Sequence, residues 1–265
     1  ISAKAKLLQF AWLGMMAFAA SVQAQTVLVC ADRAEMPPFT FAQRVNAFPS
    51  SQVIGASVDL LQAIARKHGW QLEVQLLPWA RCLREVAEDR IQIALNVGQE
   101  EARGAGLLLS RAYFSTHTIY AYSRRTHPQG LAIHSMADVS KFHVCGLGGY
   151  RFESFGLATA SVDRGTTRSY EQLITKLHLG RCDLVIDSRE TIAGMYLIDP
   201  KLRALLVDGG LGIQALPDAP QRQLFIAVSS KASNASELLK ALNEGIAGME
   251  KSREIDRFIN AYLAP

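Results

Sequence analysis

Arg103 is the residue of this sequence best placed to bind an anion. It follows the segment Ile91–Val97, in which aliphatic residues alternate with more polar ones over seven positions, and Gly98 ends the alternation. Such a pattern predicts a buried strand. Ligands of open α/β sheets bind where strands end, and a guanidinium holds a planar oxyanion through two parallel hydrogen bonds. We therefore interpret Arg103 as a candidate anion ligand. The alternative is a pair with Glu100 on a solvated turn.

The amino-terminal segment has the features of an export signal. Lys4 and Lys6 precede an apolar block, Leu7–Ala20, and the residues Val22-Gln23-Ala24 offer the small side chains that signal peptidase requires. The block is shorter than the roughly 20 residues of a membrane span. We predict a signal peptide over 1–24, cleaved after Ala24, and a periplasmic mature chain that is not embedded in the membrane.

Export to the periplasm bears on the state of the four cysteines. Oxidising compartments favour disulfides, and four cysteines allow three pairings. We favour Cys30 with Cys82 and Cys145 with Cys182, because each pair then joins neighbouring elements of one strand-helix half. A metal site built from the four thiolates is the alternative, although no Cys-x-x-Cys spacing occurs.

Charge and motifs narrow the function classes. The chain carries a net charge of +4, of which Lys4 and Lys6 account for two, and this is too little to indicate nucleic acid or an anionic membrane as partner. The sequence has no G-x-S-x-G motif, no zinc-type histidine spacing and no phosphate loop. We expect a monomeric protein without catalytic residues, cofactor or bound metal.

The elements that must position Arg103 alternate regularly. The predicted strands of this half are Val27–Ala31, Gln71–Leu77 and Ile91–Val97. Ser57 is predicted to cap a helix that Gly69 ends, and a second helix contains Cys82. Strand, helix, strand, helix, strand predicts a parallel, doubly wound sheet.

A second strand-helix series follows Tyr113. Its predicted elements are strands at Thr118–Tyr122, Phe142–Leu147, near Ser161 and at Asp183–Asp187, a short helix through Phe152 and Phe155, and a helix that Ser169 caps and Gly180 ends. The chain closes with a strand at Gln223–Ser229 and helices at Ser236–Met249 and Glu254–Leu263. If these helices pack on the first lobe, the chain crosses between the lobes twice, which makes a hinge.

A series of short motifs occurs in a characteristic order along the chain. They are Pro37-Pro38-Phe39, Gly55-Ala-Ser-Val-Asp59-Leu-Leu, Trp79, the strand leading to Arg103, Tyr113, Gly180-Arg-Cys-Asp183 and Leu239-Lys-Ala-Leu-Asn243. In these motifs the chain resembles the family 3 extracellular solute-binding proteins, the polar amino-acid receptors of ABC importers. The resemblance covers nearly the whole mature chain. It implies an α/β fold of the type II periplasmic-binding-protein kind with two lobes, each a mainly parallel sheet flanked by helices. Lobe 1 would comprise 25–115 and 222–265, and lobe 2 would comprise 116–221.

The resemblance also implies ligand residues in lobe 1. An arginine at the position of Arg103 grips the ligand α-carboxylate in these receptors. Asp32 matches an acidic position that meets a cationic group, with a plain capping role as the alternative. Trp79 matches an aromatic platform, although an aromatic there buries apolar area in any case. Asn96 lies where the family often has a hydroxyl donor.

In lobe 2 the resemblance points to a turn and a strand end. Gly148, Gly149, Tyr150 and Arg151 match a Gly-Ser-Thr-like turn whose backbone N–H groups attract a carboxylate. A purely structural glycine turn is the alternative. Asp187 lies where a carboxylate binds the ligand ammonium, although strict alignment places Ser188 there.

Three departures from the family pattern bear on the ligand. Gly98 and Glu100 replace the small hydroxyl residues that usually assist Arg103, and Tyr150 replaces a serine or threonine. A glutamate near a carboxylate ligand repels it unless it is paired. A different zwitterion, an amine or a carboxylate is therefore an open alternative to an α-amino acid.

The function that follows is capture of a small polar solute by closure of the lobes, with an ABC importer permease as partner. Two rivals stand beside it. One is a periplasmic dehydratase-like enzyme on the same fold, in which Glu35, Glu100 or Glu153 would act as acid or base. The other is a stand-alone ligand-sensing module.

Overall fold

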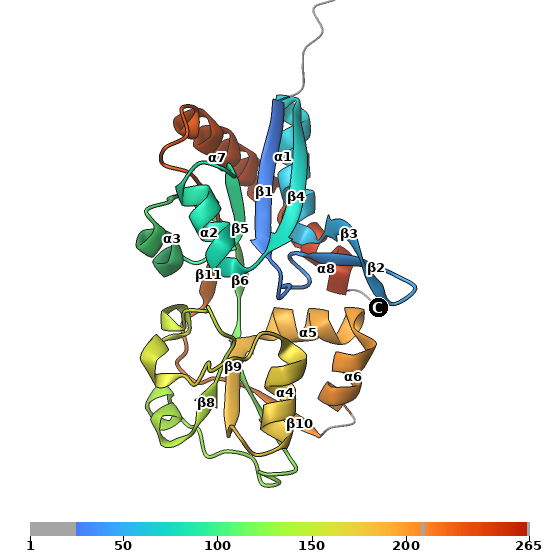
Figure 1. Ribbon diagram of the computed structural model, residues 1–265, viewed down its shortest axis with the longest axis vertical. Coiled ribbons are helices and arrows are strands. Elements are labelled where there is room, and N and C mark those ends of the chain that lie inside the picture. The colour runs from blue at the N-terminus through green and yellow to red at the C-terminus, as the bar shows by residue number, and fades with distance from the viewer. Residues whose placement is uncertain (1–24, 208–209, 264–265) are drawn as a thin grey trace, which may run out of the picture.

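The computed structural model describes residues 25–207 and 210–263 as two lobes joined by extended chain (Figure 1). The predicted signal peptide lies outside the described residues. Within the described part, no helix is both long and apolar enough to cross a membrane.

Lobe 1 is built on a five-stranded sheet with the order β4-β1-β5-β11-β6. Its strands are β1 (Gln25–Asp32), β4 (Trp70–Leu77), β5 (Ile93–Val97), β6 (Leu108–Thr116) and β11 (Arg222–Val228). Its helices are α1 (Ala56–His68), α2 (Trp79–Ala87), α3 (Gln99–Ala105), α7 (Ala235–Ser252) and α8 (Glu254–Leu263). A hairpin of β2 (Phe41–Val45) and β3 (Phe48–Ile54) projects from its side (Figure 1).

Lobe 2 is built on a four-stranded sheet with the order β10-β7-β9-β8. Its strands are β7 (Thr118–Ser123), β8 (Val144–Cys145), β9 (Leu184–Ser188) and β10 (Leu211–Ala215). Its helices are α4 (Tyr170–His178), α5 (Arg189–Ile198) and α6 (Pro200–Val207), with 3-10 turns at Met136–Lys141, Glu153–Phe155 and Thr159–Ser161.

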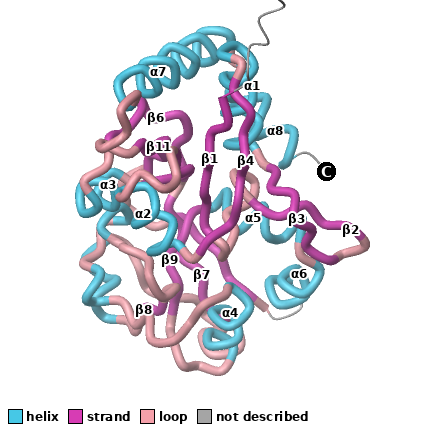
Figure 2. Tube along the Cα trace, turned by 45° about the horizontal axis from the view of Figure 1, so that its top comes forward, coloured by secondary structure: helices cyan, strands magenta, loops and turns pink. Residues whose placement is uncertain are grey.

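Two extended crossings connect the lobes. The first runs from β6 through His117 directly into β7, and the second runs from β10 to β11. The crossings are bonded to each other, since the Thr118 hydroxyl donates to the Pro220 carbonyl at 3.0 Å. Figure 2 shows the strands of both sheets running toward this junction.

Each lobe has its own apolar core. In lobe 1, α1 buries Leu60, Leu61 and Ile64 against the sheet and α7, an apolar stripe at helical spacing. A Cβ at Gly245 of α7 would lie 2.6 Å from Ile64, so only glycine permits this close approach. In lobe 2, α4 buries its apolar face, including Leu173, against β7 and β9.

Both favoured disulfides are present, which confirms the predicted pairing and removes the thiolate metal site. Cys30–Cys82 joins β1 to α2, and Cys145–Cys182 joins β8 to the segment before β9. Each bridge stays within one lobe and leaves the crossings unconstrained.

The two-lobed α/β fold is as predicted, but the sheets are mixed rather than mainly parallel. In lobe 1, β1 pairs in parallel with β4 and β5, whereas β11 is antiparallel to β5 and β6. In lobe 2, β7 is antiparallel to both β9 and β10, and β8 and β9 form the parallel pair. The antiparallel strands are those that continue across the junction.

Three local predictions were wrong. Ser57 does not cap α1, because the N-cap is Gly55 at φ 129° and Ser57 is buried inside the helix. The strand predicted over Phe142–Leu147 is limited to β8, and the segment near Ser161 is a 3-10 turn. By contrast, Ser169 caps α4 as predicted, its Oγ accepting a hydrogen bond from the Gln172 N–H at 3.3 Å.

Candidate functional site

Two adjoining cavities lie where the lobes meet, and we call them the interlobe cavities. Both are lined by Met36 of lobe 1, Tyr150 of lobe 2 and Arg222 of the second crossing. Each has room for about one water molecule, so the lobes are closed on each other. A larger open groove leads outward from them past Trp79 and Gly149.

A carboxylate from each lobe lies at the cavities. Asp32 ends β1 and accepts hydrogen bonds from the Ala34 N–H and from the Tyr150 hydroxyl. Asp187 lies in β9 and accepts hydrogen bonds at 2.6 Å from the Tyr170 hydroxyl and from the backbone N–H of the next residue. Burial raises the pKa of both carboxyls above the usual 3.8, and these hydrogen bonds oppose the rise only in part.

The two tyrosines act as hydrogen-bond donors. Burial raises the pKa of the Tyr150 and Tyr170 hydroxyls well above the ordinary value, and the neighbouring carboxylates raise it further. Both phenols therefore keep their protons. Because Tyr150 belongs to lobe 2 and Asp32 to lobe 1, their hydrogen bond ties the lobes together.

A third carboxylate, Glu101, lies at the start of α3. Its Oε2 accepts a hydrogen bond from the Gly98 N–H at 2.7 Å, which caps the helix. Its Oε1 accepts a hydrogen bond from the Trp79 indole at 3.0 Å. Arg222 approaches the same carboxylate with Nη2 at 3.4 Å, and both side chains of this ion pair are only 6% exposed.

Asn96 lines one of the interlobe cavities from lobe 1 and is the centre of a hydrogen-bond network. It takes the left-handed conformation at φ 61° inside β5, which is uncommon for a residue other than glycine. Its Oδ1 accepts hydrogen bonds at 2.6 Å from Ser57 and Tyr113, and its Nδ2 donates to the Thr40 hydroxyl at 2.9 Å. Such strain persists where surrounding contacts fix the conformation, commonly at binding sites.

The charges of this site do not balance. Among the described residues that line the interlobe cavities, Asp32, Glu101 and Asp187 are acidic and Arg222 is the one basic residue. With all four ionised the cluster carries two negative charges in excess. Buried charge of one sign either takes up protons or attracts an opposite charge. The site therefore has a negative excess that bound protons or a cationic group can offset.

The structure brings five of the predicted site residues together. These are Asp32, Trp79, Asn96, Tyr150 and Asp187, all of which line the interlobe cavities. Gly149 lies at the outer groove in a left-handed conformation at φ 92°. Asp187 and not Ser188 faces the cavities, because successive residues of a strand point to opposite sides. Ser188 is buried and caps α5 through its contact with the Thr191 N–H.

Arg103 and Arg151 lie outside this group. The Arg103 side chain is 68% exposed, and its Nη1 pairs with Glu100 Oε2 at 2.9 Å, which is the alternative that the sequence left open. Successive helical residues are about 100° apart, so Arg103 points about 200° away from Glu101 on α3. The Arg151 side chain is half exposed beside Glu153.

Sequence reasoning missed Glu101, Tyr170 and Arg222. A local sequence pattern could have identified Glu101, because a glutamate three residues after Gly98 is typical of the start of a helix. No local pattern could have identified Arg222, since its contact with Glu101 spans 121 residues. The acids considered for catalysis, Glu35, Glu100 and Glu153, lie outside the interlobe cavities and pair with Arg44, Arg103 and Arg151 respectively.

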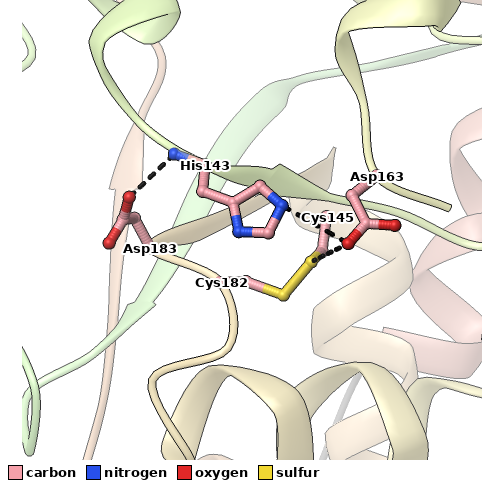
Figure 3. Close-up of a disulfide and its surroundings, with 5 residues drawn as sticks. All are labelled: His143, Cys145, Asp163, Cys182 and Asp183. Atoms are coloured by element: carbon pink, nitrogen blue, oxygen red, sulfur yellow. Dashed lines mark hydrogen bonds and ion pairs between the residues drawn. A yellow bond between two sulfur atoms is a disulfide. The ribbon is translucent and has the colours of Figure 1, made fainter. Parts of the chain in front are cut away.

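The one group of metal-ligating residues among the described segments is His143, Cys145 and Asp163. Figure 3 shows that the Cys145 sulfur is joined to Cys182. A disulfide sulfur offers no thiolate, and His143 already contacts Asp163 at 3.3 Å. This group is therefore no metal centre.

Comparisons with known proteins agree with this architecture. The family model described as bacterial extracellular solute-binding proteins, family 3, matches residues 28–265. No protein of curated function matches the chain by sequence.

Solved structures share the fold at low identity. An amino acid ABC transporter substrate-binding protein from Streptococcus pneumoniae, bound to L-arginine, is 19% identical over 90% of this chain and 94% of its own, with a TM-score of 0.69. An ancestral arginine-binding protein bound to arginine is 18% identical over 90% and 98%, with a TM-score of 0.67. A histidine kinase sensor domain is 17% identical over 91% and 97%, with a TM-score of 0.68.

Proposed function

The chain belongs to the bacterial extracellular solute-binding proteins, family 3, and on that premise we propose that it captures a small cationic, amino-acid-like solute between its lobes. The observation that carries the proposal is the acidic excess of the interlobe cavities, where three carboxylates face one guanidinium. A cationic solute supplies the missing positive charge.

The two carboxylates on opposite lobes give capture its mechanism. Asp32 belongs to lobe 1 and Asp187 to lobe 2, so a cation in contact with both stabilises the closed form more than the open one. A solute shifts an equilibrium only by its difference in affinity for the two states. A shift from 1:99 to 99:1 takes about 5.5 kcal/mol, which two charged contacts and the Trp79 ring can supply.

The closed receptor then delivers its solute to the permease of an ABC importer at the outer face of the inner membrane. This partner is supported by family membership and by the arginine-bound importer receptor of the same fold. In a strain that lacks the gene, uptake of the radiolabelled solute should fall to background and recover with the intact gene. Unchanged uptake would count against a transport role.

A thermal-shift panel tests the proposed solute class. We expect L-arginine, L-lysine or L-histidine to raise the unfolding midpoint, and L-glutamate to leave it unchanged, because a second carboxylate adds to the negative excess. Asp32→Asn should reduce the rise. Asp59→Asn is the matched control, since Asp59 also accepts a tyrosine hydrogen bond but lies on α1 away from the cavities.

The panel can also refute the proposal. A midpoint that none of the basic amino acids moves would remove the proposed solute class. A larger rise with L-glutamate than with any basic amino acid would reverse the charge preference on which the proposal rests.

A further inference from the structure

Arg222 is a buried guanidinium at the junction of the lobes. It is the first residue of β11, where the second crossing enters lobe 1, and its side chain is 6% exposed. It lines both interlobe cavities, so the group borders the space between the lobes.

The hydrogen-bonding capacity of Arg222 is largely unused. A guanidinium carries five N–H donors. Among the described residues the side-chain acceptor it meets is Glu101, at 3.4 Å from Nη2, and that carboxylate already accepts shorter hydrogen bonds from Gly98 and Trp79. Its Nε is buried and has no partner within the part of the chain that the structure describes. Because an unsatisfied buried donor is costly, the arrangement calls for a further acceptor.

The orientation of the guanidinium is fixed. Its central carbon lies 5.6 Å from the centre of the Phe155 ring, and Glu101 holds Nη2 on one side. The edge formed by Nε and Nη2 can bind a carboxylate through two parallel hydrogen bonds, because Nη2 carries a second N–H besides the one directed at Glu101.

We infer that Arg222 binds the carboxylate of the captured solute from the hinge side of the cavities, an inference that rests on the proposed function. Arg103, the anchor that the family resemblance implied, is exposed and paired with Glu100. The carboxylate end of the solute thus lies at the second crossing, and its cationic groups reach Asp32 and Asp187.

The arrangement of charged groups then narrows the solute class. Glu101 offsets the charge of Arg222, which leaves the negative charges of Asp32 and Asp187. A solute with two cationic groups contacts both acids, its one carboxylate takes the open donors of Arg222, and its single net positive charge halves the negative excess. This combination is that of a dibasic amino acid.

The competing interpretation gives Arg222 a structural role only, as the partner of Glu101. In that case its replacement lowers stability and weakens all solutes alike. The two interpretations can be distinguished by removing the carboxylate from the solute and the guanidinium from the protein, each on its own.

The experiment is calorimetric titration of the full mature chain with matched probe pairs that differ in the carboxylate alone. The pairs are L-arginine with agmatine, L-lysine with cadaverine, and L-histidine with histamine. The proteins are the wild type, Arg222→Gln, Arg222→Lys, and Arg103→Gln as the control arginine. For the pair that binds, Arg222→Gln should weaken the amino acid roughly tenfold to a hundredfold and the amine less than about threefold.

The other variants sharpen the result. Arg222→Lys keeps the charge without the planar fork, so it should recover part of the amino-acid affinity. Arg103→Gln should change neither probe by more than about threefold. Arg222→Gln alone leaves the buried Glu101 carboxylate without its arginine partner and can therefore destabilise the protein. The double variant Glu101→Gln with Arg222→Gln removes that carboxylate as well, and it should show the same selective loss of amino-acid affinity.

Two outcomes would overturn the inference while leaving the proposed function intact. One is an equal loss for both members of a pair in Arg222→Gln or in the double variant. The other is a carboxylate-selective loss in Arg103→Gln. If no member of any pair binds the wild type, the proposed function fails and this inference falls with it.

Discussion

The Tyr150 hydroxyl of lobe 2 donates a hydrogen bond to the Asp32 carboxylate of lobe 1 across the junction between the lobes. The same carboxylate is the proposed cation ligand, so the tyrosine and a solute meet at one group. The bond connects the closed lobes, and a cation that binds Asp32 has to share or replace it.

Removing this hydrogen bond should therefore shift the solute-free protein toward the open state. Tyr150→Phe deletes one hydroxyl and keeps the ring, at a cost of about 1 kcal/mol. We expect a larger radius of gyration by small-angle X-ray scattering. Tyr262→Phe is the control, because Tyr262 donates to Asp59 at 2.8 Å within lobe 1. Equal radii for the wild type and Tyr150→Phe would show that the bond does not hold the lobes together.

Solute affinity should depend on pH through Asp32 and Asp187. Burial raises the pKa of both carboxyls above 3.8 in the solute-free protein. Protonation of these two groups therefore stabilises the folded state fully below pH 3.8, and this stabilisation is lost as the pH rises through their raised pKa values. A cation binds the ionised carboxylates, so its affinity should increase through the same window.

Titrations from about pH 4 to about pH 7 measure this dependence. The groups facing these two acids are Tyr150, Glu101 and Arg222 around Asp32, and Tyr170 and Arg222 around Asp187. The variant Asp32→Asn with Asp187→Asn should flatten the profile. An affinity that rises on acidification would contradict the assignment of these acids.

Asn96 should be hard to replace. Asn96→Ala leaves Ser57, Tyr113 and Thr40 without a shared partner and places alanine at φ 61°, so we expect a loss of about 3 kcal/mol in unfolding free energy. Asn96→Gly loses the same bonds but tolerates the backbone angle, and it should be the more stable of the two in urea denaturation. An alanine variant as stable as the wild type would mean that the network contributes nothing.

The disulfide of lobe 1 should contribute stability without limiting solute capture. Cys30→Ala with Cys82→Ala opens a loop of 52 residues, for which the chain-entropy model gives about 4 kcal/mol. Because the bridge lies within one lobe, solute affinity should stay within about twofold at temperatures where the variant is folded. A large affinity loss in the folded variant would indicate that the bridge also positions the site.

The features that local sequence determines were predictable. Both disulfide pairs join elements of one half. Asp32 is the last residue of β1 and Trp79 lies two residues after the end of β4, at the strand ends where open α/β sheets place their ligands. The helix at α4 carried its cap at Ser169 and an apolar stripe of regular spacing.

The features that depend on distant contacts were not predictable. Arg103 lies on the side of α3 that faces away from the junction, and Arg222 is placed at the junction beside Glu101, a contact that spans 121 residues. The antiparallel strands of lobe 2 follow from β6 continuing through the junction into β7, which no local pattern indicates.

Isothermal titration of L-arginine, L-lysine and L-histidine into the wild type, Asp32→Asn, Asp187→Asn and the double variant measures whether these two acids hold the solute. We expect saturable one-to-one binding of at least one of these amino acids, weaker in each single variant, lost in the double variant and retained in Asp59→Asn. Undiminished affinity in the double variant would contradict this expectation, because the cation would then be held elsewhere.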